Sequence, residues 1–123
     1  MTLTVIIPTR NRPELLLKTV ASAIVNIQRD DTRILVCVDD DDKPTIDALA
    51  DIPRDVGDDR LVISVKPRED TRGEKYNRAL TEAPADVYLL GVDAAPILTK
   101  GYDDIIFEAA GIFPDGIGGV YTP

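Results

Sequence analysis

Four short apolar runs recur along the chain and limit what it can fold into. They are Leu3–Pro8, Arg33–Val38, Arg60–Val65 and Asp86–Val92. Because strands that are apolar on both faces are typical of parallel sheets covered by helices, the runs predict a buried parallel sheet. Right-handed crossovers then favour an α/β fold, an open and mostly parallel sheet with helices on both faces.

The segment between the first two runs carries the signals of a helix. Asn11 stands where an N-cap is expected, Glu14 follows at the capping-box spacing, and Pro13 suits the first turn. One helical face is formed by a stripe at fourfold spacing, Leu16, Val20 and Ile24. Further helices are predicted over 43–50, over 73–83 and over 99–113, the last ending near Gly111, and a short strand is predicted near Val120.

Length and composition favour one domain over 1–123 that is large enough to bury a core. The apolar runs are far shorter than the ~20 residues of a membrane span, and the first residues lack the pattern of a signal peptide. The single cysteine, Cys37, lies inside an apolar run and is expected to be a small core residue. These features favour a cytoplasmic location.

The formal net charge is −8, so nucleic acid and anionic membrane surfaces are not expected partners. To bind a small phosphorylated ligand, the protein would need a local positive charge that offsets its net negative charge. A helix N-terminus, a divalent cation or well-placed Arg and Lys side chains could supply it. The absence of histidine, with one cysteine, excludes a zinc site of Cys and His ligands, a Cys/His dyad and a serine triad. Neither G-x-G-x-x-G after the first run nor a P-loop is present.

Polar and charged residues follow the ends of the apolar runs. Because the carboxyl ends of parallel strands meet at one edge, where ligands bind in such sheets, we expect these residues to share one rim. The candidate nucleotide-binding residues are Pro8, Thr9, Arg10, Asp39, Asp40, Arg68 and Lys75.

The acidic run Asp39–Asp42 has two interpretations. It is a solvated acidic turn, or its first one or two carboxylates accept hydrogen bonds from a ribose or base while the later ones are exposed. Like charges at ~4 Å repel by roughly 1 kcal/mol per pair in water. We therefore expect Lys43, Arg68 or a metal ion close to the run.

Two further charged groups stand out. Asp93 either forms a turn or helix cap, or supplies a ligand to Mg²⁺ or Mn²⁺ that also holds a diphosphate. Lys75 lies near the start of its predicted helix, where a cation is unfavourable unless an anion is near, and this favours a phosphate contact. The spacing of Glu74 and Arg78 predicts a salt-bridged helix face.

Several stretches together resemble the family 2 glycosyltransferases of GT-A fold, over nearly the whole chain. They are TVIIPTRNRPELLLKTVASAI, ILVCVDDDD, GEKYNRALTEAPADVYLLGVDAAP and KGYDDII. The resemblance implies that Pro8, Thr9, Arg10 and Asp39 or Asp40 hold a nucleoside. It also implies that an Asp-rich motif after the fourth strand binds a divalent metal and the diphosphate of the donor.

In this chain the motif keeps one acid, Asp93. The second acid is replaced by Val92 if the motif is aligned as G-D-D-V, or by Ala95 if it is aligned as D-x-D. Family members also have an acceptor-binding half that carries the catalytic base, and this chain stops about where that half would begin. The remaining downstream carboxylates are Asp103, Asp104, Glu108 and Asp115. None is predicted to be the base, and the first two fit a structural turn of the family.

The first hypothesis is a domain that binds a UDP-sugar with Mg²⁺ or Mn²⁺ and transfers the sugar, with inversion, to an acceptor hydroxyl. The second is a non-catalytic binding or assembly module of the same fold. A third, a phosphate-accepting receiver-like domain, would need its acid pair after the first strand, where Pro8-Thr9-Arg10 stands. An exposed sheet edge could be covered by a second copy in a homodimer.

Overall fold

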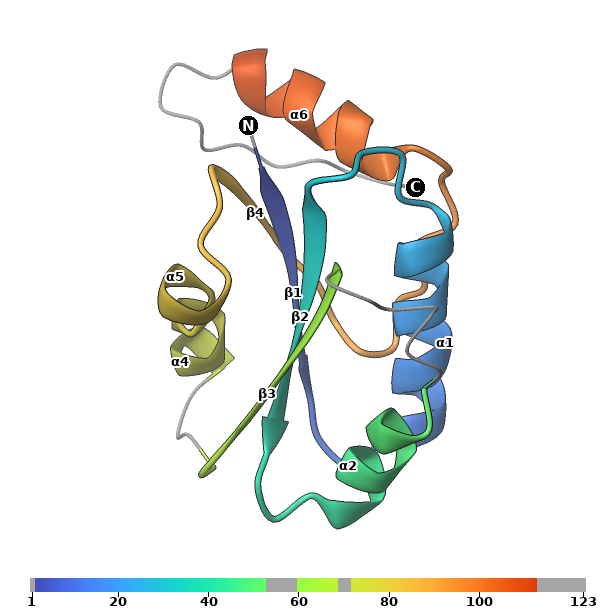
Figure 1. Cartoon of the computed structure of the whole chain (residues 1–123), viewed down its shortest axis with the longest axis vertical. Helices are drawn as coiled ribbons and strands as arrows, with labels where there is room; N and C mark the ends of the chain where they lie inside the picture. Colours follow the sequence, from blue (N-terminus) through green and yellow to red (C-terminus); the bar gives the residue numbers. More distant parts are fainter. Residues whose placement is uncertain (1, 53–59, 69–71, 113–123) are drawn as a thin grey trace.

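The computed structural model describes residues 2–52, 60–68 and 72–112 of the chain. Within them four strands form one sheet with all neighbours parallel, in the order β3-β2-β1-β4 (Figure 1). The strands are β1 (Leu3–Thr9), β2 (Thr32–Asp39), β3 (Leu61–Lys66) and β4 (Val87–Leu90). The predicted parallel sheet and α/β fold class are therefore confirmed.

Helices cover both faces of this sheet (Figure 1). On one face lie α1 (Pro13–Val25) and α2 (Lys43–Ala50), and on the other α4 (Arg72–Asn77) and α5 (Ala79–Glu82). The last described helix, α6 (Tyr102–Ile112), lies near the amino ends of the strands. No described helix is long and apolar enough to cross a membrane.

The core has two parts, one on each face of the sheet. On the α1 side, the odd-numbered residues of β1 pack with the predicted helical stripe of α1, which is buried as expected: Leu16, Val20 and Ile24. On the other side, Ile6, Leu35 and Cys37 pack against α5. Cys37 is fully buried, as its place in an apolar run predicted.

Two helix boundaries differ from the prediction. The expected helix over 73–83 is divided at Arg78 into α4 and α5. Arg78 is buried, and its guanidinium donates to the carbonyl oxygen of Ser64 in β3 at 3.2 Å, so a tertiary contact acts at the break. The helix expected over 99–113 begins only at Tyr102, after Gly101 with its positive φ, and extends to Ile112, close to the expected end. The predicted strand near Val120 and the carboxylate of Asp115 lie outside the described residues.

Asn11 does not cap α1, so this prediction is wrong. Asn11 has a φ of +54°, a left-handed conformation that asparagine tolerates, and Arg12 occupies the N-cap position without a side-chain cap. The Asn11 backbone N–H instead donates to Asp42 Oδ2 at 2.7 Å. The chain between β1 and α1 is thereby tied to the residue that precedes α2.

The strand order reverses beside β1. The chain passes from β1 to β2 and β3 on one side and then returns to place β4 on the other side of β1. In open parallel sheets, ligands bind beyond the carboxyl ends of the strands at such a reversal. The topology therefore points to the region beyond the end of β1.

Asp103, at the opposite end of the sheet, is a structural carboxylate. It is fully buried and accepts hydrogen bonds from the Gln28 and Arg29 backbone N–H groups (3.0 and 2.9 Å) and the Thr32 hydroxyl (2.7 Å). Burial alone would raise the pKa of Asp103, but these hydrogen bonds outweigh it and hold the pKa below its usual value. Asp103 therefore has a structural role, but it lies in the first turn of α6 and not in a separate turn of the chain.

Replacing Asp103 should destabilise the fold strongly. Asp103→Asn places an amide NH₂ among N–H donors, and we expect the free energy of unfolding to fall by about 3 kcal/mol in urea denaturation. The matched control is Asp104→Asn, whose half-exposed carboxylate pairs with Arg29 at 3.4 Å and should matter little. Equal effects of the two substitutions would contradict this role.

The same carboxylate should make stability depend on pH. Because the folded-state pKa of Asp103 is depressed, its contribution is fully present above the unfolded-state pKa of about 4 and is lost as the pH falls through the folded-state value. The stability difference between wild type and Asp103→Asn should therefore shrink below about pH 4. Urea denaturation at a series of pH values measures it, and a constant difference would refute the assignment.

Candidate functional site

The carboxyl ends of β1, β2 and β4 bring the predicted site residues to one rim. β1 lies between the other two strands; β2 ends in Asp39, and Asp93 follows β4. The Thr9 hydroxyl donates to Asp93 Oδ2 at 3.0 Å, and Arg10 Nη1 donates to Asp39 Oδ2 at 2.7 Å. Two consecutive residues at the end of β1 thus hold one acid on each side.

Asp39 is buried between two cations. Its side chain is 1% exposed, with Arg10 on Oδ2 and Lys75 Nζ 3.1 Å from Oδ1. Burial would raise the pKa of Asp39, but the hydrogen bonds and charges of Arg10 and Lys75 outweigh it and lower the pKa. Asp39 is therefore ionised at neutral pH and can only accept hydrogen bonds.

Arg10 also binds the exposed Asp41. Its two terminal nitrogens lie 2.8 and 3.2 Å from the Asp41 oxygens, and this bidentate pair is the main cause of the lowered pKa of Asp41. The positive charge of Arg68, which is exposed beyond β3, lowers that pKa further. The cations that contact the acidic run are thus Arg10 and Lys75, and neither was among those expected there. Of the expected ones, Arg68 contributes at longer range.

The prediction that the later acids of the run are exposed is wrong for one of them, Asp42. Asp42 is 1% exposed, and its Oδ2 receives the Asn11 N–H. Asp40 is exposed, and its backbone N–H donates to the Lys66 carbonyl oxygen at 2.8 Å. The first and last carboxylates of the run, Asp39 and Asp42, are therefore buried, and the two between them are exposed.

Asp93 lies in a turn, well before α6, and so does not cap a helix. Its carbonyl oxygen accepts the Thr19 hydroxyl of α1 at 2.7 Å, and Thr9 holds Oδ2. Oδ1 lies 3.5 Å from Arg12 Nη1. Asp93 as a whole is 8% exposed. These contacts fix one carboxylate at the rim with one oxygen toward an arginine.

Lys75 meets an anion of the protein itself. It lies in α4, is 8% exposed, and its Nζ is 3.4 Å from the Thr9 carbonyl oxygen as well as 3.1 Å from Asp39. The anion beside Lys75 is therefore the Asp39 carboxylate, and the predicted phosphate contact stays a prediction. Pro8 is buried in β1 opposite Cys37 and contributes backbone only.

Sequence reasoning missed three residues of the rim. Arg12 and Thr19, both in or beside α1, contact Asp93, and Asp41 holds Arg10. For Arg12, the available signal was its place immediately before a helix that starts at the end of a strand. Nothing in the local sequence distinguishes Thr19 from other helical threonines.

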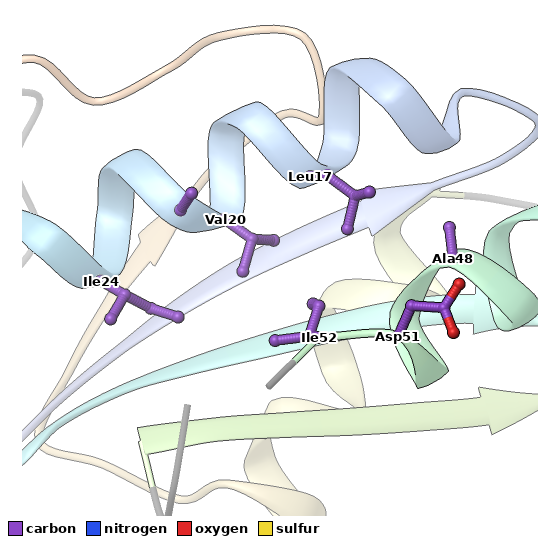
Figure 2. A pocket seen from close by; sticks show the side chains of 7 residues that line it. Leu17, Val20, Ile24, Ala48, Asp51 and Ile52 are labelled. Carbon is purple, nitrogen blue, oxygen red and sulfur yellow. The ribbon is translucent and has the colours of Figure 1, made fainter. Parts of the chain in front are cut away.

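A separate apolar pocket lies on the flank of the sheet (Figure 2). Leu17, Val20 and Ile24 of α1 face Ala48, Asp51 and Ile52 at the end of α2 across it. Its lining is almost wholly apolar, so it lacks the polar groups that a nucleotide needs. The candidate site is therefore the rim.

A metal ion at the rim would have few protein ligands. Among the described residues no three His, Cys, Asp or Glu side chains form a group that could hold a metal ion. Asp93 is a single carboxylate, and Mg²⁺ is commonly bound by one or two carboxylates together with substrate phosphates and water. The donor set fits a cation that arrives with a phosphate ligand and does not fit a cation held by protein alone.

Comparison with known families gives one match. A family model described as Glycosyl transferase family 2 matches residues 4–100, which contain every rim residue discussed above. No curated protein and no solved structure matches the chain with significance.

Replacing Lys75 should lower the stability of the fold, because Lys75 compensates the buried charge of Asp39. We expect Lys75→Met to lower the free energy of unfolding by about 2 kcal/mol, because the buried carboxylate then keeps only Arg10. Adding Asp39→Asn should recover much of that loss, since the buried charge that Lys75 had helped to compensate is gone. Urea denaturation measures both, with the exposed Lys18→Met as control. Strictly additive losses in the double variant would contradict the pairing.

Proposed function

The chain belongs to glycosyl transferase family 2, and we propose that its rim binds a nucleoside diphosphate sugar, specifically a UDP-sugar. The sugar would pass to an acceptor hydroxyl with inversion at the anomeric carbon. The observation that supports this most is the placement of Asp39 and Asp93 on either side of β1, where the strand order reverses. A ligand with a base at one end and a diphosphate at the other suits two acids so arranged.

The charge state of Asp39 supports uracil as the base. An ionised carboxylate accepts hydrogen bonds and cannot donate them. Uracil presents a ring N–H between its two carbonyl groups. Cytosine and adenine present a ring nitrogen lone pair at the corresponding edge and can donate to Asp39 only from their exocyclic amino group. Guanine also presents a ring N–H, so GDP is the informative competitor.

A base reaches Asp39 only if one cation moves. Lys75 is held beneath the rim with its side chain 11% exposed, whereas Arg10 is 32% exposed and has Asp41 as a second partner. Arg10 can therefore release Asp39 and remain paired with Asp41. Thr9 and the buried Pro8 keep the backbone of this segment fixed while the side chain moves.

Asp93 would hold Mg²⁺ or Mn²⁺ together with oxygens of the donor diphosphate. When bound, such a cation stabilises the charge that develops on the leaving diphosphate. The protein's own contribution is to fix the Asp93 backbone through the Thr19 hydroxyl and the carboxylate through the Thr9 hydroxyl. Oδ1 is thereby turned from Thr9 toward the side of Arg12. A fixed ligand loses less conformational entropy on binding than a mobile one.

The single carboxylate also favours a second candidate, a binding module that does not catalyse transfer. Among the residues that the structure describes, no second acid joins Asp93 in a metal-binding group, so cation binding would depend mainly on the diphosphate. Release of UDP from a UDP-sugar in the presence of Mn²⁺ supports the transferase. Binding without any such release, even with candidate acceptors, supports the module.

Calorimetric titration with UDP tests the proposal. The folded chain should bind UDP more tightly than CDP or ADP, and Mn²⁺ should strengthen binding. Asp39→Asn should weaken UDP binding about tenfold through loss of a charged hydrogen bond. Asp93→Asn should remove the Mn²⁺ effect while metal-free binding persists.

The control for both is Asp30→Asn, a fully exposed carboxylate between α1 and β2. It removes the same charge from the amino-end side of the sheet and should leave both affinities unchanged. No heat of binding with UDP, with or without Mn²⁺, on a folded sample would overturn the proposal. Stronger binding of GDP than of UDP would support the rim as the nucleotide site and would identify the donor as a GDP-sugar instead of a UDP-sugar.

A further inference from the structure

We infer that Arg12 is a diphosphate-binding residue, and that in the ligand-free protein it occupies Asp93 and competes there with the divalent cation. The inference deepens the proposed function and rests on it. It predicts that replacing Arg12 strengthens Mn²⁺ binding and weakens UDP binding.

Among the described cations that pair with Asp39 or Asp93, Arg12 is held most loosely. Arg10 lies 2.7 Å from Asp39 with its side chain 32% exposed, and Lys75 lies 3.1 Å from Asp39 with 11% exposed. Arg12 lies 3.5 Å from Asp93 Oδ1, and its side chain is 58% exposed. A long, single, solvent-exposed contact is weak and easily exchanged. Arg12 is thus the paired cation that an incoming anion recruits at least cost.

The backbone at Arg12 is fixed although the side chain is not. The preceding Asn11 N–H is tied to the buried Asp42, and the Arg12 carbonyl oxygen accepts the Leu16 N–H at 2.9 Å as α1 begins. Pro13, the residue after Arg12, has a fixed φ and also limits the backbone conformations open to Arg12. The guanidinium can therefore change position while its backbone stays fixed, and it can reach a ligand held beside Asp93.

The chemistry of Arg12 suits a diphosphate better than its present partner. A guanidinium binds phosphate oxygens through two parallel N–H donors, whereas its contact with Asp93 is a single one. Arg12 also sits at the N-terminus of the 13-residue α1, where the helix dipole favours anions. In a chain of net charge −8, such a local cation is what allows a diphosphate to approach.

The same arrangement disfavours a cation in the ligand-free protein. A divalent ion on Asp93 Oδ1 would stand against the guanidinium that is 3.5 Å from that oxygen. Once a diphosphate draws Arg12 away, the repulsion falls and the phosphate oxygens complete the ligand set. Diphosphate and cation binding are therefore positively coupled through Arg12.

Two binding measurements on the folded chain test this. Mn²⁺ binding without nucleotide is followed by electron paramagnetic resonance, and UDP binding without metal by calorimetry. Arg12→Gln should bind Mn²⁺ about three- to tenfold more tightly and UDP about three- to tenfold more weakly than wild type. Arg12→Lys, a point charge without the planar fork, should lie between them.

The matched control is Arg33→Gln, which removes the same charge from an exposed position near the amino end of β2 and should change neither affinity. A residue that only supported the fold would weaken both ligands together when replaced. The inference is overturned if Arg12→Gln binds Mn²⁺ no more tightly than wild type, including the case in which neither binds it. If wild type fails to bind UDP under any condition, the proposed function fails, while the Mn²⁺ comparison still reports the competition at Asp93.

Discussion

Burial of the Asp39 carboxylate is the constraint on which the rim depends. An acid that is 1% exposed requires compensation, and the chain supplies it with Arg10 from the end of β1 and Lys75 from α4. Three elements are thereby fixed around one charge. In the ligand-free protein both of these cations are engaged by Asp39, whereas Arg12 contacts Asp93 through one longer bond.

The topology turns this local pairing into a site. Because β1 lies between β2 and β4, the consecutive residues Thr9 and Arg10 control acids on opposite sides of it. The αL conformation of Asn11 then directs the chain into α1, whose first residue is adjacent to Arg12. One short segment thus links the proposed base-binding acid to the proposed cation-binding acid.

Local sequence predicted the sheet, its parallel direction and the convergence of strand ends, because continuous apolar runs carry that information in their own residues. It did not predict the burial of Asp42, since that depends on a backbone N–H 31 positions earlier in the chain. The break at Arg78 depends likewise on a contact with β3, and the contact of Thr19 with Asp93 spans 74 positions. Long-range polar contacts of this kind have no periodic signature, so only the fold reveals them.

A crystal structure of the chain with UDP and Mn²⁺ tests the central claim most directly. The account predicts the uracil ring N–H on Asp39 with Arg10 withdrawn toward Asp41, and the diphosphate between Arg12 and a cation on Asp93. Nucleotide bound away from the rim, or at the rim with Arg10 and Lys75 both still on Asp39 and no cation at Asp93, would contradict it.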